Sequence, residues 1–129
     1  MKIQIEFFKQ DLVDAIGAGI YEICVCKNGK SSTLYIGESV FVLVRCASHL
    51  YNLKKNPEYL GFTKETIEDS EISLCFHLLK QEKDTIERKK EEKRLVKEKN
   101  PLSQSGISDR QKNIEDRIEA LTNFLEESE

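Results

Sequence analysis

No apolar run in this 129-residue chain approaches the roughly 18–20 residues that a membrane-spanning helix needs. The first residues, MKIQIEFFKQD, alternate polar and apolar side chains and lack the long apolar core of a signal peptide. Internal repeats and low-complexity linkers are also missing. We therefore expect a cytoplasmic protein, with no membrane partner, whose length suits a single compact unit with a real core.

Cysteine pairs of the CxxC kind are absent. Cys24 and Cys26 lie two apart in a strand-like run, and Cys46 and Cys75 stand alone. Tetrahedral zinc sites usually show closer ligand spacing, so the sequence argues against zinc. We expect four reduced thiols that pack as small apolar side chains.

The net charge of −3 argues weakly against a polyanionic partner, but the charge is unevenly distributed. Residues 102–129 carry 7 acidic and 3 basic side chains, whereas residues 45–101 carry 13 basic and 11 acidic ones. The acidity is therefore concentrated in the tail, and a local basic surface in the middle of the chain remains open.

Alternation and β-prone composition predict four strands. Residues 2–8 form the first, the runs IYEICVC and TLYIG form the next two, and residues 70–79 form a further core strand. Asn28 and Gly29 lie between these runs and supply the positive φ angles of a tight turn. We predict an antiparallel hairpin at this position.

Three helices are predicted. The segment after Ser39 contains three valines, which also favour a strand, but Ser39 is a suitable cap for a helix that starts at Val40. A charge-dense helix covers residues 81–99 and ends before Pro101. A last helix runs to about Glu127 after a capping box of Ser108 and Gln111.

The fold class is therefore α/β in the α+β sense, a small, mostly antiparallel sheet of three to four strands flanked by helices. We assign residues 1–106 to the main domain and residues 107–129 to a C-terminal acidic amphipathic helix. Its apolar stripe packs on the domain or forms a homodimer interface. The stripe consists of Ile114, Ile118, Leu121 and Leu125.

Five short motifs occur in a characteristic order. They are GIY at 19–21, YIG at 35–37, an arginine ten residues after Tyr35, a histidine four residues later, and EKRLVKEKNPLSQ at 92–104. Together they resemble the GIY-YIG nuclease family over residues 16–106. The gap of 13 residues between the triplets is slightly long, and Gln104 stands where many members have asparagine.

The resemblance implies a metal-dependent endonuclease that hydrolyses DNA phosphodiester bonds with one Mg²⁺ or Mn²⁺. It implies double-stranded or branched DNA as the partner. The implied catalytic residues are Tyr21, Tyr35, Arg45, His49 and Glu92, with Glu92 as the metal ligand. The implied motif and structural residues are Gly19, Ile20, Ile36, Gly37 and Gln104.

Glu92 is also favoured by helical geometry. At about 100° per residue, Glu92 lies between Leu95 and Val96 on the face that presses on the sheet, whereas Glu91 lies beside solvent. A hard cation takes oxygen ligands and keeps most of its waters, so one carboxylate is sufficient. Without the resemblance, the plain interpretation of Glu92 is a solvated side chain that pairs with a lysine.

The remaining roles keep their alternatives. Arg45 suits a phosphate, although a surface ion pair is the plain alternative. The family implies that Tyr21 acts as a general base or positions water, which requires a lysine or metal-bound water to lower its pKa; Lys27, Lys30 and the helix lysines are candidates. Tyr35 positions phosphate or water.

We expect His49 either to donate a hydrogen bond or a proton to the leaving oxygen, or to be structural. We expect His77 to be structural.

A basic collar would hold the nucleic acid backbone. Its members also suit i,i+4 pairing with interleaved glutamates, and the sequence does not decide between the two. The collar residues are Lys54, Lys55, Lys89, Lys93, Arg94 and Lys97. Two other functions remain open, namely an inactive or weakly active nucleic-acid-binding module of the same fold, and an interaction protein that uses the C-terminal stripe.

Overall fold

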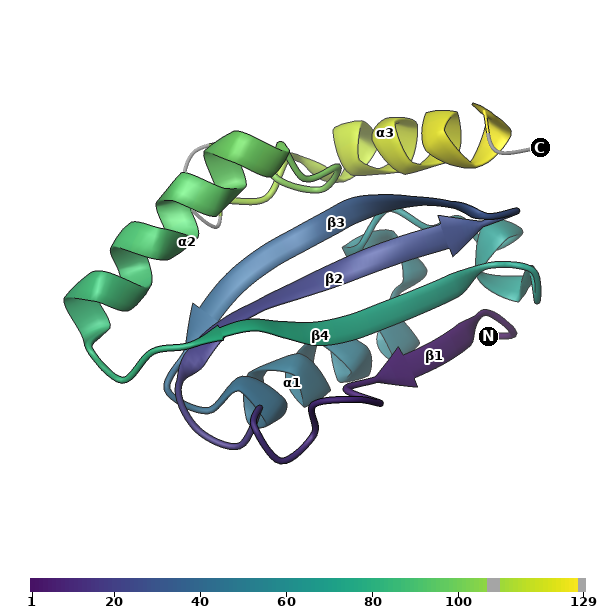
Figure 1. The fold of residues 1–129 in the computed structure, drawn as a ribbon. Coiled ribbons are helices and arrows are strands. Elements are labelled where there is room, and N and C mark those ends of the chain that lie inside the picture. The colour runs from purple at the N-terminus through teal and green to yellow at the C-terminus, as the bar shows by residue number, and fades with distance from the viewer. Residues whose placement is uncertain (107–109, 128–129) are drawn as a thin grey trace.

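A computed structural model describes residues 1–106 and 110–127 of the chain. It has an α+β fold in which a four-stranded sheet, ordered β1-β4-β2-β3, carries three helices (Figure 1). The elements are β1 (Gln4–Phe7), β2 (Gly19–Lys27), β3 (Lys30–Ser39), α1 (Val42–Lys55), β4 (Ser73–Gln81), α2 (Thr85–Lys99) and α3 (Ile114–Glu127). Two single 3₁₀ turns, η1 (Pro57–Tyr59) and η2 (Thr66–Glu68), follow α1.

The predicted order of strands and helices is confirmed, but the sheet is mixed. β2 pairs antiparallel with both β3 and β4, whereas β1 pairs parallel with β4 in the register Phe7 to Phe76. Parallel pairing is possible because β4 is far from β1 in the chain. The β2–β3 hairpin turns at Asn28 (φ 52°) and Gly29 (φ 78°), as their sequence predicts.

The helix starts differ from the predictions. α1 begins at Val42 rather than Val40, and the Ser39 hydroxyl accepts from the Phe41 amide instead of capping the helix. β4 runs to Gln81, so α2 begins only after Asp84, whose carboxylate accepts from the first helical amides.

The C-terminal helix also starts later than predicted. The proposed cap Ser108 lies outside the described residues, and Gln111 precedes α3. Asn113 supplies the observed cap, since its Oδ1 accepts from the Asp116 amide at 2.9 Å. Within the described residues no helix combines the length and the apolar character needed to cross a membrane.

The two faces of the sheet carry different helices. Tyr21 and Tyr35 pack with Val42 and Cys46 of α1 in the main core, whereas Ile20 and Ile36 pack with Val96 of α2 in a smaller cluster. Neighbouring residues of a strand point to opposite faces, so α1 and α2 cover opposite sides of the sheet. Figure 1 shows the two helices apart, on different sides of the strands.

α3 packs on its own chain. Leu121 is fully buried and Leu125 is 3% exposed, both within the main core, whereas Ile114 at the start of the stripe is 44% exposed. A Cβ at Gly61 would meet the backbone of Arg117, so this glycine allows α3 to lie close to the loop after η1.

Candidate functional site

Three aromatic rings from three elements meet on the α1 side of the sheet. Tyr21 of β2 and Tyr35 of β3 stack with ring centroids 6.2 Å apart, and the His49 ring of α1 lies 5.6 Å and 4.8 Å from them. Tyr21 and His49 are at most 1% exposed, and Tyr35 is 3% exposed. His49 lies on the buried face of α1 with Val42 and Cys46, whereas Phe41 and Val44 face solvent.

A chain of hydrogen bonds joins this cluster to a residue that the sequence did not suggest. His49 Nε2 lies 2.7 Å from the Tyr21 hydroxyl, and His49 Nδ1 lies 2.7 Å from the hydroxyl of Tyr59 in η1. A neutral imidazole donates from one nitrogen and accepts at the other, so one phenol donates to His49 and the other accepts from it. Tyr59 belongs to no motif, and only the folded chain brings it to α1.

η1 is itself held by the C-terminal segment. The carbonyl of Tyr59 accepts from Arg117 Nη1 at 3.0 Å and from Gln111 Nε2 at 3.2 Å. The ring cluster is therefore tied to α3 through the backbone of Tyr59.

Burial determines the protonation of the cluster. It raises the pKa of Tyr21 far above its ordinary value, so Tyr21 remains a neutral phenol at neutral pH. Burial, helped by the positive charge of Arg45, lowers the pKa of His49 to about 3. Neither group carries a charge at neutral pH, and a general-base role for Tyr21 has no support from this environment.

Arg45 supplies the positive charge of the cluster. Its side chain is exposed at the surface of α1 and bonds the side chain of Tyr35, within electrostatic reach of Tyr21 and Tyr59. Two of the lysines proposed to assist Tyr21 have other partners. Lys27 pairs with Asp69 at 3.2 Å and Lys30 donates to the carbonyl of Glu127.

The motif glycines make room for close contacts. A Cβ at Gly37 would overlap the hydroxyl of Tyr21 and lie 2.9 Å from the Tyr35 ring. A Cβ at Gly19 would lie 2.6 Å from the carbonyl oxygen of Lys80 on β4. The YIG glycine therefore leaves the space in which the GIY tyrosine places its hydroxyl.

Gln104 holds the edge of β3. It is fully buried, and its amide accepts from Ile36 N at 2.9 Å and donates to Ile36 O at 2.7 Å. The backbone amides of Leu102 and Ser103 donate to the carbonyls of Thr33 and Leu34 on the same edge. The Gln104 side chain thus bonds the backbone of the edge strand β3, as a neighbouring strand would. The amide side chain after Pro101 therefore has a structural function.

Glu92 belongs to the other side of the sheet. It is 4% exposed and lies one helical turn before Val96, which packs on Ile20 and Ile36. Its predicted sheet-facing position is confirmed, and the side chain of neighbouring Glu91 is 24% exposed. The structure brings together Tyr21, Tyr35, Arg45 and His49 on the α1 side, and places Glu92 with α2 on the opposite side.

Several basic collar residues are paired. Arg94 bonds Glu91 and Glu98 on α2 itself, and Lys89 pairs with Glu38 of β3 at 3.1 Å. Arg88, which is nearly buried, bonds the same Glu38. For Arg94 the pairing alternative is therefore the observed one. Lys89 also lines a hollow on α2, together with Ile86, Lys90 and Lys93.

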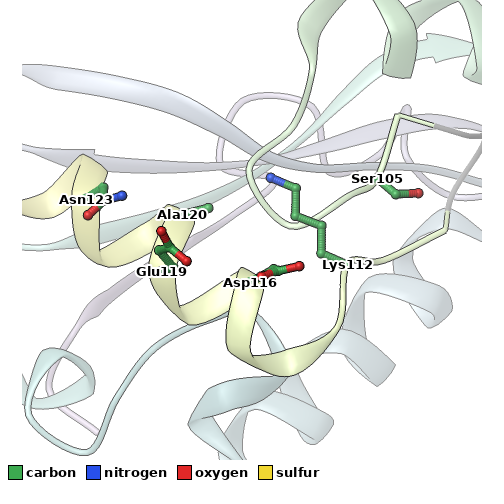
Figure 2. Close-up of a pocket in the computed structure, with 6 residues that line it drawn as sticks. All are labelled: Ser105, Lys112, Asp116, Glu119, Ala120 and Asn123. Carbon is green, nitrogen blue, oxygen red and sulfur yellow. The ribbon is translucent and has the colours of Figure 1, made fainter.

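A second hollow lies away from the ring cluster. It opens along α3 and carries both signs of charge, with Lys112 reaching over it and Asp116 and Glu119 on the helix (Figure 2). Its lining contains no residue of the predicted site. Concavity alone therefore does not identify the functional region.

Comparison with known proteins adds no assignment: no model of a protein family, no curated protein and no solved structure matches this chain.

Proposed function

We propose that the chain is a metal-dependent endonuclease of the GIY-YIG kind that hydrolyses DNA phosphodiester bonds. The observation that supports the proposal most is the union of Tyr21, Tyr35, Arg45 and His49 from three separate elements. A buried phenol–imidazole pair next to an accessible guanidinium is more than a hydrophobic core requires. Buried polar groups of this kind are costly unless they are bonded, and here Tyr21, His49 and Tyr59 form one hydrogen-bonded chain beside the Arg45–Tyr35 pair.

Arg45 is the phosphate ligand in this proposal. Its guanidinium remains charged at any working pH, and its planar fork matches two phosphate oxygens. Tyr35 bonds the same guanidinium and presents its hydroxyl beside it. Tyr21 and His49 are neutral positioning residues that hold the ring of Tyr35 and the first turns of α1 in place.

The proposed Mg²⁺ or Mn²⁺ would be held by Glu92. A buried carboxylate suits a hard cation that takes its remaining ligands from water and phosphate. When bound, such an ion stabilises charge on the phosphate and lowers the pKa of a bound water. Among the described residues Glu92 belongs to no cluster of three metal-ligating side chains, and the proposal takes it as the protein's one ligand.

Because Arg45 and Glu92 lie on opposite sides of the sheet, the proposal places the substrate at a sheet edge that both can reach. β3 is an edge strand, and both α1 and α2 contact it. Residues 102–104 cover its edge only as far as Ile36. In this proposal the phosphate binds at the following segment, Gly37–Ser39, between the Tyr35–Arg45 pair on the α1 side and Glu92 on the α2 side.

A second candidate is a nucleic-acid-binding module without turnover. The burial of Tyr21 and the position of Glu92 across the sheet favour it, because they separate the groups that catalysis would use together. It predicts binding that depends on Arg45 and on the α2 lysines but not on Glu92.

One experiment separates the two candidates. Purified protein is incubated with supercoiled plasmid in Mg²⁺, Mn²⁺ or EDTA, next to the variants Arg45→Ala, Tyr35→Phe and Glu92→Gln. Arg94→Ala is the matched control, because Arg94 is exposed and paired within α2.

We expect metal-dependent nicking by the wild type and by the control, reduced about 10²-fold or more in each of the other variants. DNA binding by anisotropy should survive Glu92→Gln. Binding without cleavage of plasmid, branched DNA or single strands supports the second candidate, and an unimpaired Glu92→Gln enzyme shows that Glu92 is not the ligand.

A further inference from the structure

A group of metal-ligating side chains lies on the sheet face opposite the ring cluster. Glu22 and Cys24 are alternate residues of β2, so they point to the same face, and His77 of β4 is the cross-strand partner of Glu22. One ligand atom from each of the three lies within 4.8 Å of the others. The β2–β4 pairing therefore brings the group together without any contribution from a loop.

The carboxylate of Glu22 is held in one orientation. Its Oε2 accepts from Thr33 Oγ1 at 2.5 Å and from Lys99 Nζ at 3.1 Å, and its Oε1 lies 2.7 Å from His77 Nε2. Glu22 itself is 3% exposed. One oxygen is thus anchored by two donors, and the other is presented to the imidazole, an arrangement in which outer partners orient a metal ligand.

The spacing suits a small tetrahedral ion. Zinc lies about 2.0–2.1 Å from oxygen and nitrogen and about 2.3 Å from sulfur, which places neighbouring ligand atoms roughly 3.3–3.7 Å apart. The oxygen and nitrogen must therefore separate by roughly 0.6 Å, and the sulfur must approach by at most about 1 Å. His77 is 39% exposed and Cys24 half-buried, so both side chains have room to rotate.

We propose that Glu22, Cys24 and His77 form a site for Zn²⁺. The ion would take the place of the proton between His77 Nε2 and Glu22 Oε1, which would pass to solvent or to His77 Nδ1. The Cys24 thiol would release its proton to solvent, and a water molecule would complete the tetrahedron. Thiolate and imidazole ligands favour zinc over Mg²⁺, so this site is distinct in chemistry and position from the hard cation proposed at Glu92. Lys99 stays on the anchored oxygen.

Neighbouring thiols provide internal comparisons. Cys26 lies two residues further along the same strand and face as Cys24, and Cys75, the cross-strand partner of Cys24, donates to Glu6 Oε2 at 2.9 Å. The sequence signal is the period of two in ExCxC at 22–26 and CxH at 75–77. A search for CxxC misses it, because that spacing describes loop-borne zinc ligands.

The test uses the full chain under a reductant that does not bind metal. Zn²⁺ alone is titrated calorimetrically into the wild type, Cys24→Ser, His77→Gln and the control Cys26→Ser. We expect one ion per chain in the wild type and in the control, and at least tenfold weaker binding in the other two. With Co²⁺ as the probe, a thiolate-to-metal absorption band should appear in the wild type and vanish in Cys24→Ser.

Alkylation of the wild type keeps the proposal testable if the variants fold poorly. Zn²⁺ should slow modification of Cys24 at least tenfold and leave Cys26 unaffected, EDTA should reverse the effect, and Mg²⁺ should not produce it. Equal modification of Cys24 with and without Zn²⁺, or equal loss of binding in Cys24→Ser and Cys26→Ser, overturns the site. None of these readouts depends on nuclease activity.

Discussion

The buried His49 makes the stability of the fold depend on pH. It is fully buried, both ring nitrogens bond tyrosine hydroxyls, and burial lowers its pKa to about 3. In the unfolded chain the imidazole has a pKa of about 6.5. Because the folded value is the lower one, the unfolded state binds the proton first, and acid therefore favours unfolding.

The size of the effect follows from this difference. The stabilisation is fully present above pH of about 6.5 and is lost between about 6.5 and 3 as the pH falls. Linkage predicts a loss of about 1.4 kcal/mol by pH 5.5 and roughly 5 kcal/mol over the whole window.

Urea unfolding of the wild type and of His49→Gln at pH 7.5, 6.5 and 5.5 measures this directly. Comparison of the two cancels the titration of carboxylates, and His77→Gln serves as the control for the only other histidine. We expect the wild type to lose about 1.4 kcal/mol more than His49→Gln between pH 7.5 and 5.5. A constant difference between the two proteins over this range refutes the description of His49 as buried and neutral.

Four further predictions concern the fold around the site. Gln104→Leu should destabilise the protein by roughly 2–5 kcal/mol in urea melts, because two backbone groups of Ile36 lose their partners. Gln104→Asn keeps an amide and should destabilise the protein less than Gln104→Leu. Arg88→Met should cost about 3 kcal/mol by leaving Glu38 half-paired in a nearly buried position, while the exposed control Arg94→Met on the same helix should leave the melting midpoint almost unchanged. Gly37→Ala should cost about 1–3 kcal/mol and displace the Tyr21 ring, visible as a changed near-ultraviolet spectrum; a neutral effect would mean that the strand shifts freely. Leu121→Ala should cost about 2–5 kcal/mol by calorimetry, since α3 fills the core, and a negligible cost would place α3 off the domain in solution.

Local sequence signals predicted much of the fold. The Asn28–Gly29 turn, the strand order along the chain and the end of α2 before Pro101 depend on neighbouring residues, and all three are confirmed. The parallel pairing of β1 with β4 was not predicted, because it joins segments about 70 residues apart and no local pattern encodes which edge a strand takes. α1 and α2 begin later than predicted, because the strands before them, β3 and β4, extend beyond their apolar runs.

For the candidate site, the spacing of residues along the sequence predicted which side chains lie on the same helix or strand. It did not predict which face of the sheet each helix covers. Arg45 and His49 lie one turn apart on α1, yet one is exposed and the other is buried with two tyrosines. Tyr59 could not be predicted, because a long-range contact through α3 positions it. The side taken by α2, and with it Glu92, depends on how the chain crosses after β4, which periodicity does not specify.

The central proposal is that Arg45 binds a DNA phosphate at the end of β3, and that a cation held by Glu92 assists hydrolysis of the phosphodiester bond. The most direct test is the single-turnover cleavage rate of plasmid DNA in Mg²⁺ by Glu92→Gln, measured at protein concentrations that saturate binding. We predict a loss of about 10²-fold or more relative to the wild type, with DNA affinity unchanged. Cleavage at the wild-type rate by Glu92→Gln would contradict the claim.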